Sequence, residues 1–444
     1  MRTIVCYILL LASLTTIISC QKDESESNQN NNPNSENPYD SPTAVVNMIP
    51  EKTPIELTDN QKLYIQSAND FTFNLFRKAM SVKESSILSP LSVLYVLGML
   101  NEGADGETAK EIMQVLGFNG AEKTDVNKFC ANLIKNAPKV DPNVKLNMTN
   151  ALFVNKHISL LPDYVQDMMD YYHAAVKSLD FSDTSAVNMI NEWCGNQTDG
   201  MIDHILEKTT PDAVAYLLNA VLFKAEWTDK FNPEHTKEGY FNKYDGTRQI
   251  LPMMSRNANA LYVRQDGFAA LCLPYSSGAF NMYVLLPDDG VTVIDVLEKM
   301  SAGYWEQTKG KMSNFERHSE SNGENKESYY VKRIVDIQIP RFASYFHTDL
   351  TQPLREIGLN RAFTDEAEFP LISSSKMKIS HCLQDAKIEV DEQGTKTAAV
   401  TITETLDAAI PETIVQFHAD RPFAYLIQET TSGAIFFVGT YMGD

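Results

Sequence analysis

The 444-residue sequence is short of positive charge. Its 38 lysines and arginines stand against 58 aspartates and glutamates, which gives a formal net charge of -20. Polyanions bind proteins through clustered lysine and arginine side chains. We therefore expect no nucleic-acid partner and no heparin-like activator, and we look instead for protein partners.

The sequence also lacks the motifs of common hydrolases and nucleotide-binding enzymes. It has no Gly-x-Ser-x-Gly elbow and no His-Glu-x-x-His motif, and Gly310-Lys311 has Trp305 where a phosphate-binding loop needs its leading glycine. The histidines are scattered, which suits solvated or core positions better than metal ligation: His157, His173, His204, His235, His318, His347, His381 and His418. We predict no catalytic residue, no metal and no cofactor.

Closely spaced cysteines are missing as well. The chain has no Cys-x-x-Cys pair, and beyond Cys6 and Cys20 its cysteines are far apart within apolar runs: Cys130, Cys194, Cys272 and Cys382. Such positions favour buried free thiols over a disulfide framework. We assign these four cysteines no redox or metal role.

No apolar run at the N-terminus is long enough to span a membrane. An apolar core over residues 4–14 follows Arg2 and precedes Ile17-Ile18-Ser19-Cys20. This layout predicts a secretory signal peptide over residues 1–19. Small residues before the cysteine resemble a bacterial lipobox, which implies that Cys20 is lipidated. An ordinary cleaved signal with an unrelated cysteine is the alternative.

Residues 20–54 are almost devoid of apolar side chains before Val45. They are rich in Asn, Ser, Glu and Pro, so they cannot bury enough surface to offset conformational entropy, and we predict a flexible spacer. The acidic residues 21–26 resemble the tract that sends some lipoproteins of Bacteroides-like bacteria to the cell surface, although acidic residues also suit any solvated tether. We expect an exported lipoprotein held at the outer membrane and facing outward.

Residues 55–444 have the patterning of one large globular domain. Helical spacing runs from Phe71 to Ala79, a helix apolar on nearly all sides continues from Val93 to Leu100, and a third helix ends at Gly117. Strands are predicted later, with continuous apolar runs marking those covered on both faces: Asn150 to Val154, Val214 to Phe223, Phe268 to Leu273, Phe280 to Leu286, Ile334 to Ile339 and Phe423 to Ile427. Early helices and late strands favour mixed α+β architecture. The polar stretch from Glu316 to Ser328 is predicted to be an exposed loop.

One stretch, from Glu392 to Ala409, reads as a strand without an obvious place in that architecture. No proline or glycine interrupts the run from Thr395 to Ile410, so every residue in it can join a backbone ladder. One alternating face carries only small uncharged residues: Thr395, Thr397, Ala399, Thr401, Thr403 and Thr405. Over residues 395–406, the other face carries both charges, Lys396 and Glu404. This pattern indicates a loop that can become a strand.

The order of several short motifs resembles the serpin family from about Leu63 to Gly443. The motifs are Ser89-Pro90-Leu91-Ser92, Gly103-Ala104 with Gly106 and Thr108, Asn191 and Trp193 before Thr198-Asp199-Gly200, Asn219 to Trp227, Leu286-Pro287, Ile339-Pro340-Arg341-Phe342, Glu389 to Thr395, and Asp420-Arg421-Pro422-Phe423. The resemblance implies three β-sheets, eight or nine helices and an exposed reactive-centre loop at about residues 392–416. It also implies a monomer that inhibits serine endopeptidases, and also papain-like cysteine endopeptidases, by suicide-substrate trapping.

The resemblance assigns the parts of the loop by position. The hinge residues are Glu392, Gly394, Thr395, Thr397, Ala398 and Ala399, and counts from both ends of the loop place the scissile bond at Ala408-Ala409. Ala408 before the cut favours an elastase-like target. A cut after the flanking residue Asp407 favours Asp-directed enzymes, and a cut after Leu406 favours chymotrypsin-like, subtilisin-like or papain-like ones.

The resemblance also places two polar groups around the sheet that receives the loop. Ser89, Ser92, Asn219 and Gln384 match a central cluster called the shutter, in which Gln384 stands where the family commonly has His. Trp227, Arg341 and Glu392 match the breach, where the loop first enters; an exposed, weak Arg341–Glu392 pair is the alternative. Three residues depart from the family pattern: Gln384 replaces the common His, and Thr397 and Val400 stand where Ala is more usual. A second function therefore remains open, that of a non-inhibitory serpin acting as a surface binding module.

Overall fold

The structure, a computed structural model, describes residues 52–322, 325–395 and 412–444. All of them belong to one compact unit, Ile49–Asp444. Among the described residues, no helix is long and apolar enough to cross a membrane. The predicted signal peptide, Cys20 and most of the spacer lie outside the described residues.

Nine α-helices and three short 3-10 helices lie within the described residues. The α-helices are α1 Asp59–Ala79, α2 Pro90–Gly103, α3 Gly106–Leu116, α4 Lys123–Asn136, α5 Pro162–Tyr172, α6 Thr184–Gln197, α7 Val293–Glu298, α8 Ala302–Gly310 and α9 Thr351–Glu356. The 3-10 helices are η1 Ala137–Lys139, η2 Pro233–His235 and η3 Arg361–Phe363.

The strands of the described residues form three sheets. The main sheet has the order β12 (Phe342–Asp349), β13 (His381–Asp391), β14 (Gly394–Thr395), β4 (Ala215–Glu226), β2 (Lys145–Asn155) and β3 (Ala175–Leu179). The second sheet has the order β1 (Ser86–Leu88), β17 (Ile435–Tyr441), β16 (Phe423–Glu429), β9 (Phe280–Pro287), β8 (Phe268–Tyr275) and β7 (Tyr262–Gln265). The third has β10 (Phe315–Asn322), β11 (Asn325–Pro340), β6 (Arg248–Ala258) and β5 (Lys237–Asn242), with β15 (Glu412–His418) also paired to β11.

The first helices form where the sequence predicts them. The Thr58 hydroxyl accepts from the Gln61 amide while the Gln61 side chain accepts from the Thr58 amide, a capping box that starts α1. Pro90 occupies the first turn of α2, which is buried on nearly every side. Gly117 ends α3 in the left-handed conformation, with φ of 73°. The buried helix and the glycine stop are both confirmed.

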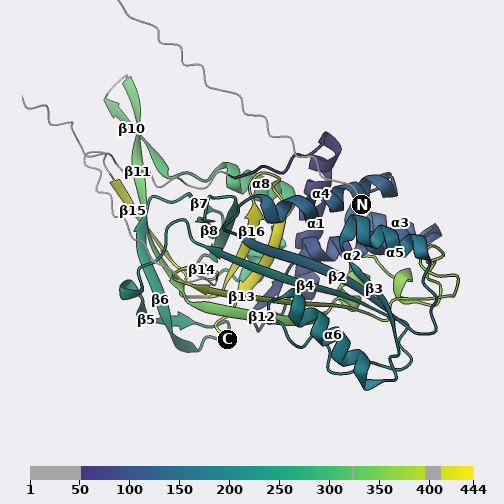
Figure 1. The fold of residues 1–444 in the computed structure, drawn as a ribbon. Helices are drawn as coiled ribbons and strands as arrows, with labels where there is room; N and C mark the ends of the chain where they lie inside the picture. Colours follow the sequence, from purple (N-terminus) through teal and green to yellow (C-terminus); the bar gives the residue numbers. More distant parts are fainter. Residues whose placement is uncertain (1–51, 323–324, 396–411) are drawn as a thin grey trace, which may run out of the picture. The chain divides into compact units, whose positions relative to one another are not determined.

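The main sheet is covered on both faces. Helix α2 packs on one face against β2 and β4, as part of the large apolar core that also joins the second sheet. Helix α6 lies across the other face (Figure 1), where Ile190 and Cys194 join Phe153, Tyr216 and Leu218 in a separate core. A strand buried on both faces carries apolar residues at successive positions, which explains why β4 reads as a continuous apolar run.

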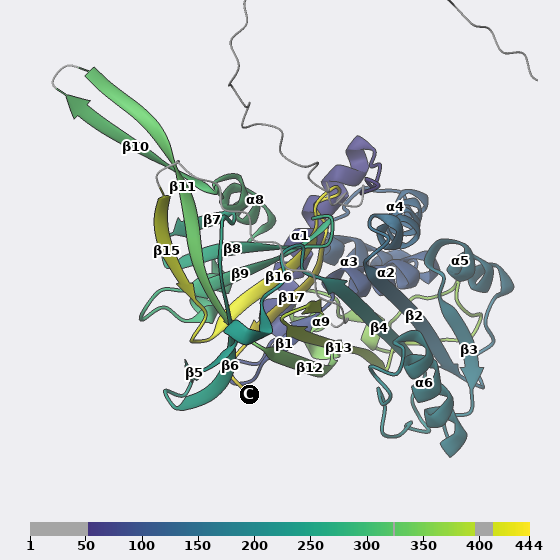
Figure 2. The ribbon, with the colours of Figure 1, turned by 60° about the vertical axis from the view of Figure 1, so that its left-hand side comes forward.

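The stretch from Glu316 to Ser328, predicted as a loop, is a β-hairpin. Strands β10 and β11 pair antiparallel from Phe315↔Lys332 to Asn322↔Asn325, and the hairpin extends away from the other described elements (Figure 2). The prediction was wrong because the sequence here is polar at successive positions, so no period-two apolar signal marks a strand. Backbone pairing alone defines this element.

The fold class is confirmed: three sheets and nine α-helices of the described residues form mixed α+β architecture. The four cysteines of this part of the chain are buried and free, as predicted. Burial raises the pKa of the Cys130, Cys194 and Cys272 thiols to about 12. These thiols are therefore protonated and unreactive at neutral pH.

Candidate functional site

The first loop residues already lie between two strands of the main sheet. Gly394 pairs with Glu226 of β4 and Asp391 of β13, so the short strand β14 is inserted between the ends of β4 and β13. Gly394 has φ of 140°, and a Cβ at this position would collide with the carbonyl oxygen of Ala225. Only glycine fits this turn into the sheet.

Below β14 the two neighbouring strands are separated. Strands β13 and β4 pair in parallel from His381↔Tyr216 to Asp385↔Ala220. For the described residues, no backbone pairing joins 386–389 of β13 to 221–224 of β4. The main sheet therefore has a gap between β13 and β4, which β14 closes at one end and direct pairing of the two strands closes at the other. The two strand edges along this gap have the hydrogen-bonding groups that an added strand needs.

Trp227 fixes the chain where it enters the gap. Its backbone N–H donates to the Gln393 carbonyl at 2.8 Å, and its indole N–H donates to the Asp391 carbonyl at 2.9 Å. The ring stacks on Tyr275 with centroids 4.3 Å apart, and the Tyr275 hydroxyl lies 3.0 Å from the hydroxyl of buried Thr395. The structure thus brings Trp227, Gly394 and Thr395 together.

Glu392 and Arg341 form an ion pair beside this entrance. The Arg341 guanidinium donates to both carboxylate oxygens of Glu392, and the Thr236 hydroxyl donates to one of them at 2.6 Å. The Glu392 side chain is only 6% exposed, whereas that of Arg341 is 49% exposed. Burial opposes ionisation of Glu392, but the hydrogen bonds from Arg341 and Thr236 outweigh it and lower the pKa of Glu392 below its ordinary value.

The four shutter residues meet under the lower end of the gap. Gln384 donates to the Asn219 side-chain oxygen at 2.8 Å and to the Ser89 carbonyl at 3.0 Å, and it accepts from the Ser89 amide at 2.9 Å. The Ser89 and Ser92 hydroxyls are hydrogen-bonded to each other. All four side chains are buried. Gln384 therefore uses both its donor and its acceptor here.

Gln384 and Asn219 tie β13 to β4 next to the point where the strands separate. They are register partners, and the next pair, Asp385↔Ala220, is the last before the gap. Asn219 also donates to the Asn150 side-chain oxygen on β2 at 2.7 Å. Sequence reasoning missed the role of Asn150; its signal was a polar residue opening an otherwise apolar strand. Separating β13 from β4 further requires breaking the Gln384–Asn219 bond.

On the opposite face of β13, Asp385 is fully buried. It accepts hydrogen bonds from the Tyr345 hydroxyl at 2.7 Å and from the His347 ring, both on β12. The hydrogen bond that His347 donates to the Asp385 carboxylate raises the pKa of His347. These contacts join β13 firmly to β12, so the two strands are expected to move together when the sheet opens. Nothing in the sequence pattern marked this pair.

The remaining predicted loop residues lie outside the described part of the chain. They are Thr397, Ala398, Ala399, Leu406, Asp407, Ala408 and Ala409. The hinge residues that the structure does describe, Glu392, Gly394 and Thr395, all lie at the entrance to the gap.

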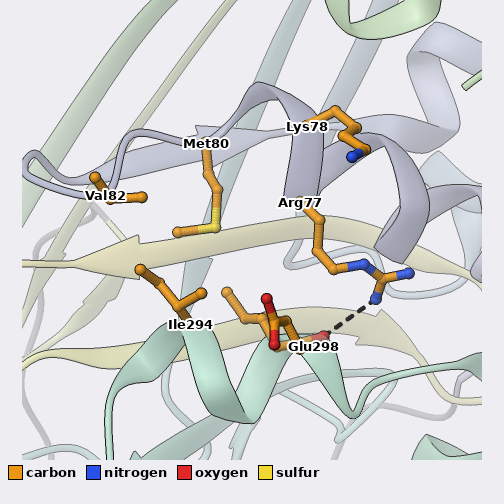
Figure 3. A pocket seen from close by; sticks show the side chains of 7 residues that line it. Arg77, Lys78, Met80, Val82, Ile294 and Glu298 are labelled. Atoms are coloured by element: carbon orange, nitrogen blue, oxygen red, sulfur yellow. Dashed lines mark hydrogen bonds between the residues drawn. The ribbon is translucent and has the colours of Figure 1, made fainter. Parts of the chain in front are cut away.

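The described residues contain no cluster of three or more His, Cys, Asp or Glu side chains suited to a metal. A surface pocket of about 470 Å³ lies between the end of α1 and α7 (Figure 3), lined by Arg77, Lys78, Met80, Val82, Ile294, Leu297 and Glu298. The Arg77 guanidinium donates to the carbonyls of Leu297 and Met300 at 3.1 and 2.8 Å. Arg77 therefore holds the end of α7 in place.

Comparison with known proteins identifies the family to which a chain with this fold belongs. The family model described as "Serpin (serine protease inhibitor)" matches residues 66–443. The chain belongs to the serpin family. Members of this family are generally protease inhibitors and not enzymes.

Individual relatives span most of the chain. A rat alpha-1-antiproteinase is 28% identical over 83% of this chain and 86% of its own length. An uncharacterised serpin-like protein of Thermococcus kodakarensis is 28% identical over 98% of both chains. Human glia-derived nexin is 30% identical over 80% of this chain and 87% of its own.

Solved serpin structures in two conformational states can be compared with this fold. The native state of the thermophilic serpin tengpin, 27% identical, superposes with a TM-score of 0.78 over 88% of this chain and 96% of that chain. The latent state of tengpin, 26% identical, gives 0.71 over 88% of this chain and 99% of that chain. Human thyroxine-binding globulin complexed with its hormone, 26% identical, gives 0.74 over 86% of this chain and 98% of that chain. The described fold therefore lies closer to the native than to the latent tengpin structure.

Replacing Gln384 with alanine tests the shutter geometry. Gln384→Ala leaves the Ser89 amide and the Asn219 side chain buried without their partner, so we expect a loss of about 1–3 kcal/mol in the free energy of unfolding. Chemical denaturation measures it. Gln114→Ala, on the exposed side of α3, is the control and should change stability by less than about 0.5 kcal/mol. Equal stability of the two variants would contradict the assigned hydrogen bonds.

The Glu392 ion pair predicts a pH dependence. Because the pKa of Glu392 is lowered in the folded chain, its contribution is present above its ordinary value of 4.5 and disappears as pH falls through the lower, folded value. Glu392→Gln should therefore be less stable than wild type at pH 7, and the difference should shrink below pH 4.5. Thermal unfolding measures this across pH, with exposed Glu84→Gln as control. A pH-independent difference would contradict the ion pair as its cause.

Proposed function

We propose that the chain traps serine endopeptidases by inserting its cleaved reactive loop into the main sheet. The single observation that supports this most strongly is β14, which already pairs Gly394 and Thr395 with β4 and β13 above a gap between those strands. The sequence after Thr395 continues the same alternation of two faces. On the alternating face that would turn inward, the residues up to Thr405 are small and uncharged, as burial requires.

Insertion supplies both the energy and the distance that trapping needs. About fourteen residues added to the sheet, at roughly 0.5–1.5 kcal/mol net per hydrogen bond, amount to on the order of 10 kcal/mol before packing. At about 3.3 Å per residue, the inserted strand spans about 45 Å. A protease joined to the loop as an acyl-enzyme is carried that far, and its nucleophile is pulled out of line with its base and oxyanion hole. The chain itself supplies only the bait and the stored free energy.

We infer an elastase-like target from Ala408, which fits a small apolar specificity pocket. Leu406 adds a second apolar contact. Cleavage after Leu406 would instead select chymotrypsin-like, subtilisin-like or papain-like enzymes, and cleavage after Asp407 would select Asp-directed ones. The count to Ala408-Ala409 rests on loop length, so identification of the released fragment by mass spectrometry decides among these bonds.

We further propose that the inhibitor is a bacterial lipoprotein. Cys20 follows the apolar signal segment, and the acidic and polar residues up to 54 separate it from the folded domain. A lipidated cysteine with such a spacer would hold the domain clear of the outer membrane, on the outside of the cell. The protein partner in this setting is an extracellular protease.

A non-inhibitory binding protein is the second candidate function. It is favoured by the structural likeness to thyroxine-binding globulin and by Gln384 in the shutter. The pocket beside α1 offers a cavity for a small ligand, but Arg77 Nη1 already donates to two backbone carbonyls there and Nη2 donates to the Asn74 side-chain oxygen. Inhibition is therefore the function better supported by the geometry.

Incubation with pancreatic or neutrophil elastase tests inhibition. We expect a complex of inhibitor plus protease that survives boiling in detergent, because an ester bond joins the two chains. The loop-cleaved protein should also unfold at a much higher temperature than the intact one. Elastase with its serine blocked beforehand is the control and should give no complex. Cleavage without complex and without added thermal stability would favour the binding-protein alternative.

A charge on the inserting face should convert the inhibitor into a substrate. Thr397→Arg would bury a guanidinium without a partner, so insertion slows and the acyl-enzyme is hydrolysed first. We expect the stoichiometry of inhibition to rise several-fold. Ala398→Arg is the matched control, since the sequence alternation assigns residue 398 to the outer face of the inserted strand, and it should leave stoichiometry near the wild-type value. If both variants inhibited like wild type, the assignment of faces would be wrong.

A further inference from the structure

The β10–β11 hairpin stands beside the strand that continues from the reactive loop. Strand β15, which begins at Glu412, runs parallel to β11 from Lys332↔Glu412 to Gln338↔His418. In front of Lys332, β11 continues as one arm of the hairpin back to Asn325. Figure 2 shows this hairpin projecting past the start of β15.

The hairpin is longer than the segment that joins the proposed scissile bond to β15. Seven residue steps separate Lys332 from Asn325, about 24 Å of strand. Four steps separate Glu412 from Ala408, which places the proposed scissile bond within about 15 Å of the start of β15 even when the chain is fully extended. The chain connection alone keeps that bond near Lys332, where β15 begins beside the base of the hairpin. A globular protease holding that bond therefore lies within reach of the hairpin.

One face of the hairpin and β15 exposes large apolar side chains. Tyr330 is 66% exposed, Ile414 is 69% exposed and Phe315 is 40% exposed. The register places Phe315 opposite Lys332, and Ile414 opposite Ile334, on the same side as Tyr330. Alternate residues on the other side are buried: Val331, Val335 and Phe417. Exposed aromatic and aliphatic residues grouped on one face are typical of protein-binding surfaces.

The base of the hairpin is fixed to β15 and to the rest of the third sheet. The Thr413 hydroxyl on β15 donates to the Glu316 carboxylate on β10 at 3.1 Å. The Arg333 amide donates to the Asn314 carbonyl at 2.9 Å, and the Asn259 side chain donates to the carbonyls of both Asn314 and Arg333. A surface held in this way loses little conformational entropy when a partner binds.

We propose that the face formed by Phe315, Tyr330 and Ile414 is a second contact surface for the protease bound at the reactive loop. This inference rests on the proposed function for its partner. The surface fits a protease with an apolar patch beside its substrate cleft, and it selects among proteases that accept the same bait residue. Its continuity with β15 distinguishes it from Tyr240 and Ile250, which are 63% and 56% exposed on β5 and β6 at the opposite edge of the third sheet.

Site-specific photo-cross-linking tests the contact directly. The probe is whichever of pancreatic elastase, chymotrypsin and subtilisin cleaves the loop fastest, with its nucleophilic serine changed to alanine so that no acyl-enzyme forms. A benzophenone side chain at position 330 should cross-link to this protease, while the same group at position 240 should not. Equal cross-linking at both positions, or none at 330, overturns the proposal. Cross-linking of 330 to a second copy of the chain also overturns it and assigns the face to self-association.

Association kinetics test whether the contact matters. Tyr330→Ser should lower the second-order rate constant of inhibition at least fivefold, with unchanged stoichiometry, whereas Tyr240→Ser should stay within twofold of wild type. A hairpin shortened by joining Glu316 to Val331 through Asn-Gly keeps the register of the base and should lose at least as much. Unchanged rates in Tyr330→Ser overturn the proposal even if the shortened chain does not fold.

The proposed trapping and the proposed second contact surface can be contradicted independently. If wild type gives no complex with the active protease that survives boiling, the proposed trapping is wrong. The cross-link from position 330 to the inactive protease still decides whether this face contacts a protease at the loop.

Discussion

The structure depends on backbone hydrogen-bonding groups in the middle of the main sheet that no other described strand pairs. Buried N–H and C=O groups are costly when they lack partners, and strands β4 and β13 present two such edges over residues 221–224 and 386–389. The gap is closed below by direct pairing and above by β14. A segment that can supply alternating donors and acceptors and a small inward face relieves this cost, and the chain carries such a segment directly after β14.

Two groups of polar side chains lie at the ends of the gap. One contains a buried carboxylate and the other contains buried side-chain amides. At the entrance, Glu392 is held by Arg341 and Thr236, which orients the turn through Gly394. At the lower end, Gln384 joins Asn219 across the two strands. Both arrangements are specific in geometry and are broken only at a cost, so they stabilise the two ends of the gap. The fold superposes better on native tengpin than on latent tengpin.

Much of this arrangement was predictable from sequence. The continuous apolar runs of β4 and β8, the buried α2 and the glycine after α3 each have a local signal in residue type and spacing. The breach and shutter residues were found only through the order of family motifs, because polar side chains distant in sequence carry no periodic signal. The β10–β11 hairpin was missed for a related reason: its strands are defined by backbone pairing, and the polar sequence from 316 to 328 has no apolar alternation to reveal the period. Asp385 with His347 was missed because pairing across β12 and β13 depends on register, which the sequence does not state.

Hydrogen–deuterium exchange before and after loop cleavage is the most direct test that the gap receives the loop. Cleavage with a metalloprotease such as thermolysin, which forms no acyl-enzyme, separates insertion from trapping. If the cleaved loop inserts into the gap, alternate amides within 221–224 and 386–389 should exchange slowly only after cleavage, because a new strand then pairs with both edges. Unchanged exchange at both edges in the cleaved protein would contradict it.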